Sequence, residues 1–370
     1  MKILHITIGL ASGGAERFVV DLANEQSKSN DVTLLTLKND EGSDGFYFKE
    51  VASRVKYVDL GIKEKLGIKT LSLLYRKIRN INPDVAHFHL QAVLYAALPY
   101  ILLNRRPLYV QTLHNDAKIA INSGGPVLAY LTKLIYKLSL VKLVTISKAN
   151  RASFKTECGF DSASLIYNGR NKPLCHQPDT IKNELEKYKN NRETLIITHI
   201  GRCCQQKNQR LLITSFNQAV QEGANAILLI IGEGYDSEEG IILKKMAGDH
   251  IFFMGGQRYV ADYLLNSDAF VLSSLFEGMP IALIEAFACG CIPLSTPVSG
   301  SIDLIQDGIN GFISADFSEN SFLVMLKRFF TNHKKIDKDT LKQYFEKELI
   351  IEHCTTKYMD MYKKYLRVFT

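Results

Sequence analysis

Short apolar runs alternate with amphipathic stretches along the first half of the chain. The runs have the length of buried strands, and the stretches between them place apolar residues three or four positions apart, as helices do. Strands are predicted at Lys2–Ile8, Asp31–Leu37, Asp84–His89, Leu108–Leu113 and Leu143–Ile146, and helices at Ala15–Ser27, Leu71–Asn80 and Pro126–Leu143. Strands that alternate with helices indicate a parallel sheet with right-handed crossovers.

A polar, lysine-rich stretch follows, and the alternation then begins again. The second series predicts strands at Thr194–Ile200, Ala226–Ile231, Ile251–Phe253, Ala269–Leu272 and Ile292–Ser295, and helices at Asn208–Glu222, Val260–Asn266 and Pro280–Cys289. We therefore predict an α/β fold of two Rossmann-like, doubly wound parallel-sheet domains, 1–172 and 194–350, joined by an interdomain segment at 173–193. Ligands bind beyond the carboxyl ends of the strands in such sheets, and two sheets that face each other would form a cleft lined by both.

The composition is typical of a soluble globular protein. The 370 residues, 46% hydrophobic and 22% charged, suit two domains with a core each. The longest apolar run, Ala92–Leu103, is broken by Pro99 and is too short to span a bilayer. The N-terminal strand lacks the long apolar core of a signal peptide, so we expect a cytosolic protein. The seven cysteines form no CxxC pair and are interpreted as reduced packing residues.

Positive charge is concentrated in the first half. Residues 1–170 contain 23 Lys+Arg and 14 Asp+Glu, whereas residues 171–370 contain 22 and 24. This asymmetry predicts an anionic partner for the first domain. No zinc-finger or RNA-binding signature accompanies the charge, so nucleic acid is not predicted as that partner.

Two glutamates flank the start of a predicted helix in the segment 272–286. Glu277 lies in the turn after a strand, and Glu285 lies more than one turn into the helix that Pro280 opens. A helix N-terminus attracts phosphate, Gly278 lets a ligand approach the backbone, and carboxylates accept hydrogen bonds from vicinal sugar hydroxyls. The alternative is a pair of ordinary glutamates near a helix end, but burying an idle charge at Glu285 would be costly.

Two cations follow the strand Thr194–Ile200. Arg202 and Lys207 lie between that strand and the next helix, where a guanidinium and an ammonium suit a diphosphate and its developing charge. Solvated surface charges are the alternative interpretation. A third loop, Gly13-Gly14, opens the first helix without the spacing of the dinucleotide fingerprint, and by itself it indicates only a tight turn.

Together these segments resemble family 4 glycosyltransferases, retaining enzymes of the GT-B fold, of the type that builds bacterial surface polysaccharides. The resemblance is closest from Gly201 to Phe312 and most specific around Glu277 and Glu285. Further similar pieces follow in the expected order: Gly13-Gly14-Ala15-Glu16-Arg17, Leu113-His114-Asn115, Ile146-Ser147-Lys148, Tyr167-Asn168-Gly169, Gly232-Glu233-Gly234 and Gly308-Ile309-Asn310-Gly311-Phe312.

The resemblance implies a role for each candidate residue. Arg202 and Lys207 would hold the donor diphosphate, Glu277 the sugar hydroxyls and Glu285 the ribose, while His114 would lie near the reacting sugar. The implied catalytic residues are Glu277, Arg202, Lys207 and His114, and the implied donor-binding residues are Gly13, Gly14, Arg202, Lys207, Gly255, Gln257, Glu277, Gly278, Met279, Pro280, Ile281 and Glu285. Cys203-Cys204-Gln205 departs from the family, whose members carry polar or small residues there. The C-terminal residues 351–370 are expected to form a helix on the first domain.

The function implied is transfer of a sugar, with retention of configuration, from a nucleotide-diphosphate donor to a glycan acceptor. A UDP-sugar is favoured over a GDP-sugar, and a lipid-linked acceptor in lipopolysaccharide or capsule synthesis is expected. Two alternatives stay open: a sugar-nucleotide epimerase of similar shape, and a non-catalytic nucleotide-sugar binder. The sequence does not reveal the donor sugar, the linkage or the oligomeric state.

No metal and no cofactor are predicted. His87-Phe88-His89 puts two imidazoles on one strand face, but a third ligand is not evident. Asp337-Lys338-Asp339 imitates the metal motif of another glycosyltransferase fold, yet it follows no strand and is interpreted as a solvated loop or helix start. Charge on the leaving group would then be met by Arg202, Lys207 and the helix N-terminus.

The first domain is expected to dock on the cytoplasmic face of a membrane. Basic residues cluster there, and the predicted helix 126–143 is apolar over most of its surface and carries Tyr130 and Tyr136. The alternative is a buried helix with ordinary solvated lysines. The basic residues concerned are Lys63, Lys65, Lys69, Arg76, Lys77, Arg79, Arg105, Arg106, Lys133, Lys137 and Lys142.

Overall fold

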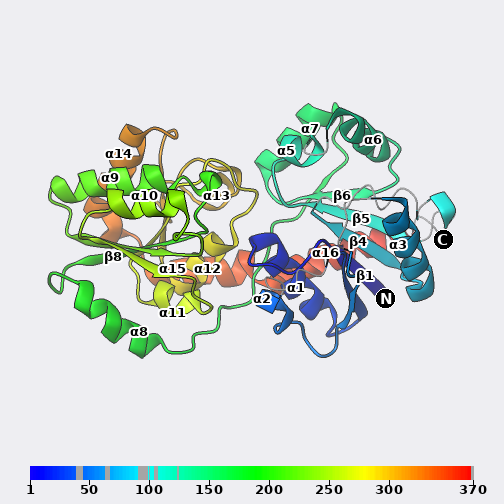
Figure 1. Ribbon diagram of the computed structural model, residues 1–370, viewed down its shortest axis with the longest axis horizontal. Helices are drawn as coiled ribbons and strands as arrows, with labels where there is room; N and C mark the ends of the chain where they lie inside the picture. Colours follow the sequence, from blue (N-terminus) through cyan, green and yellow to red (C-terminus); the bar gives the residue numbers. More distant parts are fainter. Residues whose placement is uncertain are drawn as a thin grey trace. The chain divides into compact units, whose positions relative to one another are not determined.

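A computed structural model describes residues 1–38, 45–62, 67–90, 99, 101–103, 107–122 and 125–367. The chain divides into two compact units. Unit 1 contains Met1–Asn171 and Ile350–Thr370, and unit 2 contains Lys172–Leu349 (Figure 1). The chain therefore passes from one unit to the other twice, and its C-terminal helix belongs to unit 1.

Unit 1 is built on a seven-stranded sheet in the order β3-β2-β1-β4-β5-β6-β7, and all of its strand pairs are parallel. Its strands are β1 (Lys2–Thr7), β2 (Asp31–Thr36), β3 (Lys56–Asp59), β4 (Val85–His89), β5 (Leu108–Leu113), β6 (Lys142–Thr145) and β7 (Ser164–Leu165). Its helices are α1 (Gly14–Gln26), α2 (Gly45–Phe48), α3 (Ile68–Ile81), α5 (Ala117–Asn122), α6 (Pro126–Lys137), α7 (Lys148–Cys158) and α16 (Ile351–Arg367).

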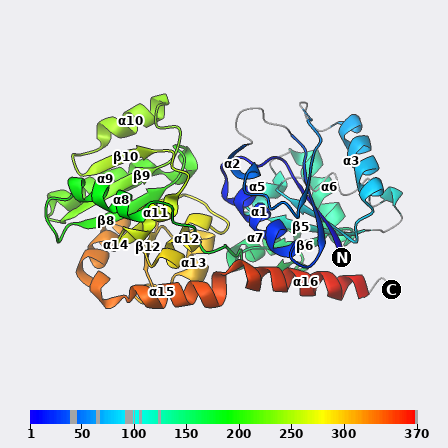
Figure 2. The same cartoon turned by 90° about the horizontal axis from the view of Figure 1, so that it is seen from below.

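Burial explains why these segments form strands and helices. Strands β4 and β5 are buried along their whole length, as expected for a parallel sheet covered on both faces. Helix α16 contacts α1 and β5, and its Tyr358 and Tyr362 are fully buried (Figure 2). The C-terminal helix is therefore part of the core of unit 1 and not an appendage.

Unit 2 is built on a six-stranded parallel sheet in the order β10-β9-β8-β11-β12-β13. Its strands are β8 (Leu195–Ile200), β9 (Ala226–Ile231), β10 (Ile251–Gly255), β11 (Ala269–Leu272), β12 (Ile292–Ser295) and β13 (Phe312–Ile313). Its helices are α8 (Pro178–Leu185), α9 (Gln209–Gln221), α10 (Glu238–Met246), α11 (Val260–Leu265), α12 (Ile281–Cys289), α13 (Ser299–Leu304), α14 (Glu319–Asn332) and α15 (Lys338–Tyr344). Short η helices lie at Glu186–Tyr188, Gln205–Lys207, His333–Lys335 and Phe345–Leu349.

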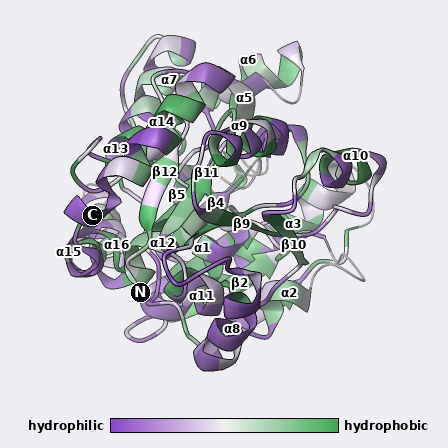
Figure 3. Ribbon diagram, turned by 90° about the vertical axis from the view of Figure 1, so that its left-hand side faces the viewer, coloured by the Kyte–Doolittle hydropathy of each residue, from purple (hydrophilic) through white to green (hydrophobic). Residues whose placement is uncertain are grey.

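The stretch 173–193, predicted as an interdomain segment, contains a helix that belongs to unit 2. Helix α8 contacts α11, and its last residue, Leu185, is buried against Ile196 and Tyr263. Helix α8 was not predicted because it is mostly hydrophilic, whereas β9 is hydrophobic throughout (Figure 3). A single buried anchor is enough to dock the helix but gives little apolar periodicity.

Two predicted helix boundaries need correction. Helix α6 ends at Lys137 and not at Leu143, because Ser139 adopts a left-handed φ of 53° and the chain then enters β6. Lys142 therefore lies on a strand and not along the helix. Pro280 is the N-cap of α12 and not its first residue, with an extended ψ of 118°.

Each sheet has a point at which its strand order reverses. In unit 1 the reversal lies between β1 and β4, and in unit 2 between β8 and β11. Helices that leave neighbouring strands at such a point run to opposite faces of the sheet, which opens a crevice at the carboxyl ends.

Candidate functional site

The predicted site residues fall into two groups, one in each unit. Gly13, Gly14 and His114 belong to unit 1, and all the others belong to unit 2. Most of them follow the carboxyl end of a strand or begin the helix after it, whereas Gly255 ends β10 and Glu285 lies within α12. The larger group surrounds the reversal between β8 and β11.

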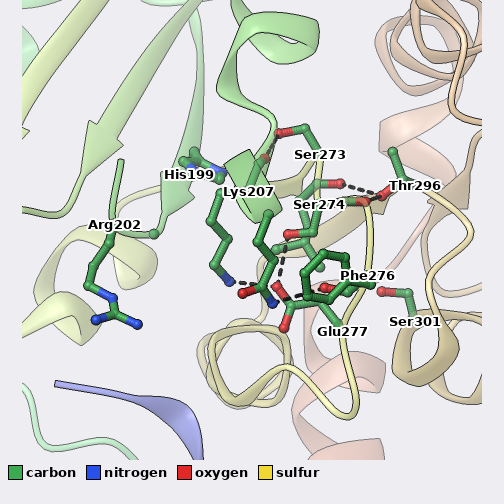
Figure 4. A network of polar contacts seen from close by, with 12 residues as sticks. His199, Arg202, Lys207, Ser273, Ser274, Phe276, Glu277, Thr296 and Ser301 are labelled. Carbon is green, nitrogen blue, oxygen red and sulfur yellow. Dashed lines mark hydrogen bonds and ion pairs between the residues drawn. The ribbon is translucent and has the colours of Figure 1, made fainter. Parts of the chain in front are cut away.

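An ion pair joins the two loops at that reversal in unit 2. Lys207 Nζ lies 2.6 Å from Glu277 Oε1, and Ser274 Oγ donates to the same oxygen at 2.9 Å (Figure 4). The two charged side chains are only 20% and 11% exposed. Partial burial strengthens the attraction, so each side chain fixes the position of the other.

Three further hydrogen bonds, each to a backbone carbonyl oxygen, hold the same two loops together. Leu275 N donates to Gln206 O at 2.8 Å, and Gln206 Nε2 donates to Phe276 O at 3.0 Å. Ser273 Oγ donates to Lys207 O, also at 2.8 Å. The spacing between the cation loop and the carboxylate loop is therefore set by four independent contacts, including the ion pair.

Arg202 stands apart from this ion pair. Its side chain is exposed, and Figure 4 shows its guanidinium lying apart from the Lys207–Glu277 pair. Its backbone is held by Gln209 Nε2, which donates to Arg202 O at 2.8 Å. Tyr235 supports the neighbouring Gly201 by donating from its hydroxyl to Gly201 O at 3.0 Å. The residue is thus anchored at its backbone while its guanidinium projects into solvent, available to an anion.

The start of helix α12 supplies backbone N–H donors beside Glu277. Only Leu283 and Ile284 donate to Pro280 O, so the N–H groups of Ile281 and Ala282 precede the first helical bonds. Gly278 and Met279 are buried against α13, where Gly300 fits only because it lacks a side chain. A Cβ atom there would lie 2.7 Å from Gly278 O and from Met279 Cα. The loop therefore rests on a rigid support.

Glu285 lies one turn further along α12 and is 8% exposed. Gly255 is the last residue of β10, and Gln257 lies in the turn that follows. There Gly255 has a φ of +68°, and Gln257 Nε2 donates to Met254 O at 2.7 Å. The structure brings both segments to the carboxyl edge of the sheet in unit 2, but it places Gly255 three strands away from Glu277 in the strand order.

In unit 1, Gly13 is the N-cap of α1 and Gly14 its first residue. His114 follows β5 and is 7% exposed. Burial lowers the pKa of His114 to about 3, so its imidazole is neutral at pH 7. His114 Nε2 lies 3.1 Å from His89 Nδ1, and His89 in turn contacts His5.

A third imidazole, which was not evident in the sequence, lies beside His87 and His89. The parallel register pairs His5 of β1 with His87 of β4, and ligand nitrogens of His5, His87 and His89 lie within 4.8 Å of one another. The sequence did not identify His5 as a neighbour of His87, because the pairing of two strands 82 residues apart is not visible in a single sequence. Asp337, in contrast, caps α15 by accepting from Asp339 N and Thr340 N, as the predicted helix start requires.

Helix α6 exposes an apolar face in unit 1. Val127 and Tyr130 are 71% and 68% exposed, and Lys133 is bound to Glu157 at 2.6 Å. Further exposed residues of this helix and its end are Leu131, Leu134 and Leu138.

Some of the other basic residues that were predicted to cluster lie outside the described residues. They are Lys63, Lys65, Arg105 and Arg106, together with the side chain of Lys69. Within the described helices, none combines the length and the apolar content that crossing a bilayer requires.

Two sequence families match this chain, one in each half. The family described as Glycosyltransferase Family 4 matches residues 12–172, and the family described as Glycosyl transferases group 1 matches residues 180–347. Together they cover nearly the whole length of both units. The reversal loops of unit 2 lie inside the second match.

Curated relatives and solved structures point the same way. The Escherichia coli "UDP-Gal:alpha-D-GlcNAc-diphosphoundecaprenol alpha-1,3-galactosyltransferase" is 23% identical over 352 residues, or 89% of this chain and 87% of that protein. A Campylobacter jejuni relative, "N-acetylgalactosamine-N,N'-diacetylbacillosaminyl-diphospho-undecaprenol 4-alpha-N-acetylgalactosaminyltransferase", is 26% identical over 351 residues, or 90% and 92%. Anabaena HepE, solved with UDP and glucose, has the same fold at a TM-score of 0.80 and 14% identity, covering 98% of this chain and 99% of HepE.

Proposed function

Because this chain belongs to glycosyltransferase family 4, we propose that it transfers a sugar from a UDP-sugar to a lipid-linked glycan in the synthesis of a cell-surface polysaccharide. The chain is a glycosyltransferase with the GT-B fold, whose two parallel-sheet domains are units 1 and 2. The finer elements of the proposal are the donor, the acceptor, the stereochemistry and the absence of a metal.

The observation that carries the proposal is the Lys207–Glu277 pair beside the N-terminus of α12. A diphosphate needs cations and backbone donors, and a sugar needs a carboxylate that accepts from its hydroxyls. Unit 2 presents all of these at one strand reversal. Arg202 and Lys207 would hold the diphosphate, Glu277 would bind the sugar, and Glu285 would bind the ribose.

This arrangement supports a departure of the leaving group that needs no metal ion. Negative charge develops on the diphosphate as the glycosidic bond breaks. Lys207 and the N–H groups at Ile281 and Ala282 would stabilise that charge from fixed positions, and the exposed Arg202 guanidinium would add a second positive charge. Glu277, whose Oε1 atom is held by Lys207 and Ser274, would orient the sugar, and the family resemblance implies that it does so without forming a covalent bond. Retention of configuration is expected from the family.

The relatives' names support the choice of donor and acceptor. The E. coli enzyme is named for UDP-Gal, and both curated relatives are named for diphosphoundecaprenol-linked acceptors. HepE was solved with UDP and glucose. We extend these chemistries to this chain, with unit 1 as the acceptor-binding domain because positive charge gathers there.

Docking on the cytoplasmic face of an anionic membrane is the second part of the proposal. A lipid-linked acceptor stays in the bilayer, so the enzyme has to meet it at the surface. The exposed face of α6, with Val127, Tyr130 and Leu134, would enter the interface, and Arg76 and Arg79 of α3 would attract anionic lipids. Lys133 contributes less than its position in the sequence indicates, because Glu157 neutralises it.

A donor screen tests the proposal directly. UDP, GDP and a panel of their sugars would be added to the full chain in excess EDTA, and the melting temperature recorded. The proposal expects UDP compounds to raise the melting temperature and GDP compounds to leave it unchanged. Stabilisation by GDP-sugars alone, or only after addition of Mn²⁺ or Mg²⁺, would overturn the choice of donor or the metal-free mechanism.

A further inference from the structure

A chain of buried hydrogen bonds links Gln26 to His114 through two other imidazoles. His5 Nε2 lies 2.7 Å from Gln26 Oε1, and His5 Nδ1 lies 3.0 Å from His89 Nε2. His89 Nδ1 then lies 3.1 Å from His114 Nε2. All four side chains are more than nine-tenths buried. At the end of the chain, His114 Nδ1 is buried and has no hydrogen-bond partner among the described residues.

Strand register builds this chain at the reversal point of unit 1. His5 lies on β1, the neighbouring strand β4 carries His89, and His114 follows β5. Directly after His89, Leu90 adopts a left-handed φ of 57° that is strained for a residue with a branched side chain. Strain of this kind persists where the surrounding structure holds it, and it concentrates at functional sites.

Because the three histidine rings are neutral, each hydrogen bond in this series has one donor nitrogen and one acceptor. Burial lowers the pKa of His5 to about 4 and that of His114 to about 3. Burial and the neighbouring histidines lower the pKa of His89 well below its usual value. All three rings are therefore neutral at pH 7, and each has one N–H donor and one acceptor nitrogen.

In the structure the amide oxygen of Gln26 faces His5 Nε2, while Gln26 Nε2 is buried without a hydrogen-bond partner among the described residues. The proton positions on the three rings follow from this orientation of the amide. A carbonyl oxygen only accepts, so His5 is protonated on Nε2 and its Nδ1 accepts. His89 must then donate from Nε2 to His5 and accept at Nδ1. His114 must donate from Nε2 to His89, which leaves His114 Nδ1 with a lone pair and no proton.

We propose that Gln26, His5 and His89 are positioning residues that hold His114 in the Nε2-protonated tautomer, so that its Nδ1 accepts a hydrogen bond from a substrate hydroxyl group. The substrate half of this statement rests on the proposed function. An unpaired buried acceptor is destabilising, and a hydroxyl donor would satisfy it. Because Nδ1 is covered in this structure, substrate binding has to uncover it.

A metal ion is the competing use of this cluster. His5, His87 and His89 could together ligate one. However, each of their ring nitrogens already has a protein partner: His87 Nδ1 lies 2.7 Å from the Tyr362 hydroxyl oxygen, and His87 Nε2 lies 2.8 Å from Thr112 Oγ1. A metal would have to break these bonds, so the geometry favours the hydrogen-bonded chain.

The first test reads the tautomer in the ligand-free protein. The full chain would be labelled with ¹⁵N-histidine, and two-bond ¹H–¹⁵N correlations would be recorded at pH 7.5, with His114→Gln used to assign its resonances. The proposal expects His114 to be neutral and protonated on Nε2. Protonation on Nδ1, a charged ring, or bound metal that shifts the His5 and His89 resonances would overturn it.

The second test separates positioning from a structural role. His89→Leu and Gln26→Met interrupt the series of hydrogen bonds from Gln26 to His114. His87→Leu removes an equally buried imidazole of the same cluster but leaves that series of hydrogen bonds intact. With a UDP-sugar that supports turnover, kcat should fall about tenfold in the first two variants, the factor of roughly one hydrogen bond, with the donor KM unchanged. Equal losses in all three variants would show a structural role only.

The two tests keep this inference separate from the proposed function. The tautomer of His114 is measured without any substrate, so it can be correct even if no sugar is transferred. A confirmed tautomer with no turnover on any donor would refute the proposed function alone. Turnover by a protein whose His114 is protonated on Nδ1 would refute the inference alone. Addition of the active UDP-sugar should also shift the Nδ1 resonance, and an unchanged resonance would overturn the substrate half.

Discussion

At the scale of single residues, the charge balance at the β8–β11 reversal is the informative feature. Lys207 and Glu277 neutralise each other at 2.6 Å, whereas Arg202 remains exposed. The sequence predicted two cations for the diphosphate but could not show that one of them is already paired with the carboxylate expected to bind the sugar. That pairing depends on two loops 70 residues apart.

Replacing the cations tests this arrangement. Arg202→Ala and Lys207→Ala should each lower kcat by about 10² to 10³, because each removes a fixed positive charge from the leaving diphosphate. Steady-state kinetics with the active donor measures the loss. Lys244→Ala is the matched control, since it removes an equally simple ion pair with exposed Asp236 in the same unit. Near-normal turnover by the double variant Arg202→Ala/Lys207→Ala would exclude the diphosphate role.

The buried histidines also predict how stability depends on pH. Burial lowers the pKa of His5 and of His199 to about 4, against 6.5 in the unfolded chain. Between pH 4 and pH 6.5 these histidines are protonated in the unfolded state but stay neutral in the folded state. The stability contribution is therefore complete above pH 6.5 and is lost as the pH falls toward 4. Each such histidine should cost about 1.4 kcal/mol of unfolding free energy per pH unit in that window.

Urea unfolding followed by circular dichroism measures this effect. The free energy of unfolding should be flat from pH 8 to pH 7, which is the internal control, and should fall between pH 6.5 and pH 5. The carboxylates with lowered pKa values, such as Glu157 and Asp236, titrate below this window. Constant stability down to pH 5 would mean that these imidazoles are not buried as described.

At the scale of elements, the sequence predicted the strands better than the helices. Strands β5, β9, β11 and β12 have the predicted bounds, because a parallel strand buried on both faces is a continuous apolar run. The sequence did not predict helices α2, α5, α7, α8, α10, α13 and α14 or strands β3, β7 and β13. Most of these elements are short or polar, but α14 has 14 residues and five buried apolar side chains, and its pattern was overlooked. Helix α6 was predicted six residues too long, since apolar residues continue past Lys137 into β6.

The support beneath the α12 loop can be tested with one methyl group. In Gly300→Ala the new Cβ would lie 2.7 Å from the backbone of Gly278 and Met279, which cannot move as a flexible side chain could. We expect a loss of about 1–3 kcal/mol in stability together with weaker UDP binding, measured by urea unfolding and calorimetry. In the control Gly248→Ala, the Cβ would meet only the Asn217 side chain. Unchanged UDP affinity in Gly300→Ala would remove the support role.

The exposed face of α6 gives a second prediction at this scale. Replacing Val127, Tyr130 and Leu134 by Ser should abolish flotation with anionic vesicles at low salt, because it removes apolar surface that would enter the interface. Folding should be unaffected, since these side chains are solvent-exposed. Lys133→Ala, which loses only a pair with Glu157, is the control. If the wild-type protein does not float with anionic vesicles, membrane docking is wrong.

At the scale of the whole molecule, two features decide how far the sequence could lead. The repeated alternation of strands and helices was sufficient to predict two doubly wound α/β units, and motif order was sufficient to predict the family. Long-range pairing was not predictable: the Gln26–His5–His89–His114 chain depends on register among β1, β4 and β5. The polar stretch 173–193 likewise gave no sign that α8 packs in unit 2.

The central claim is that unit 2 binds a UDP-sugar at the β8–β11 reversal and that the enzyme transfers its sugar. The most direct measurement is incorporation of radiolabelled sugar from a UDP-sugar panel into undecaprenyl-diphosphate-linked glycans, in excess EDTA. We predict a labelled lipid product with the wild-type protein and at least about a hundredfold less with Glu277→Ala. Release of an epimerised nucleotide sugar, or binding of UDP-sugars with no transfer to any acceptor, would contradict the account.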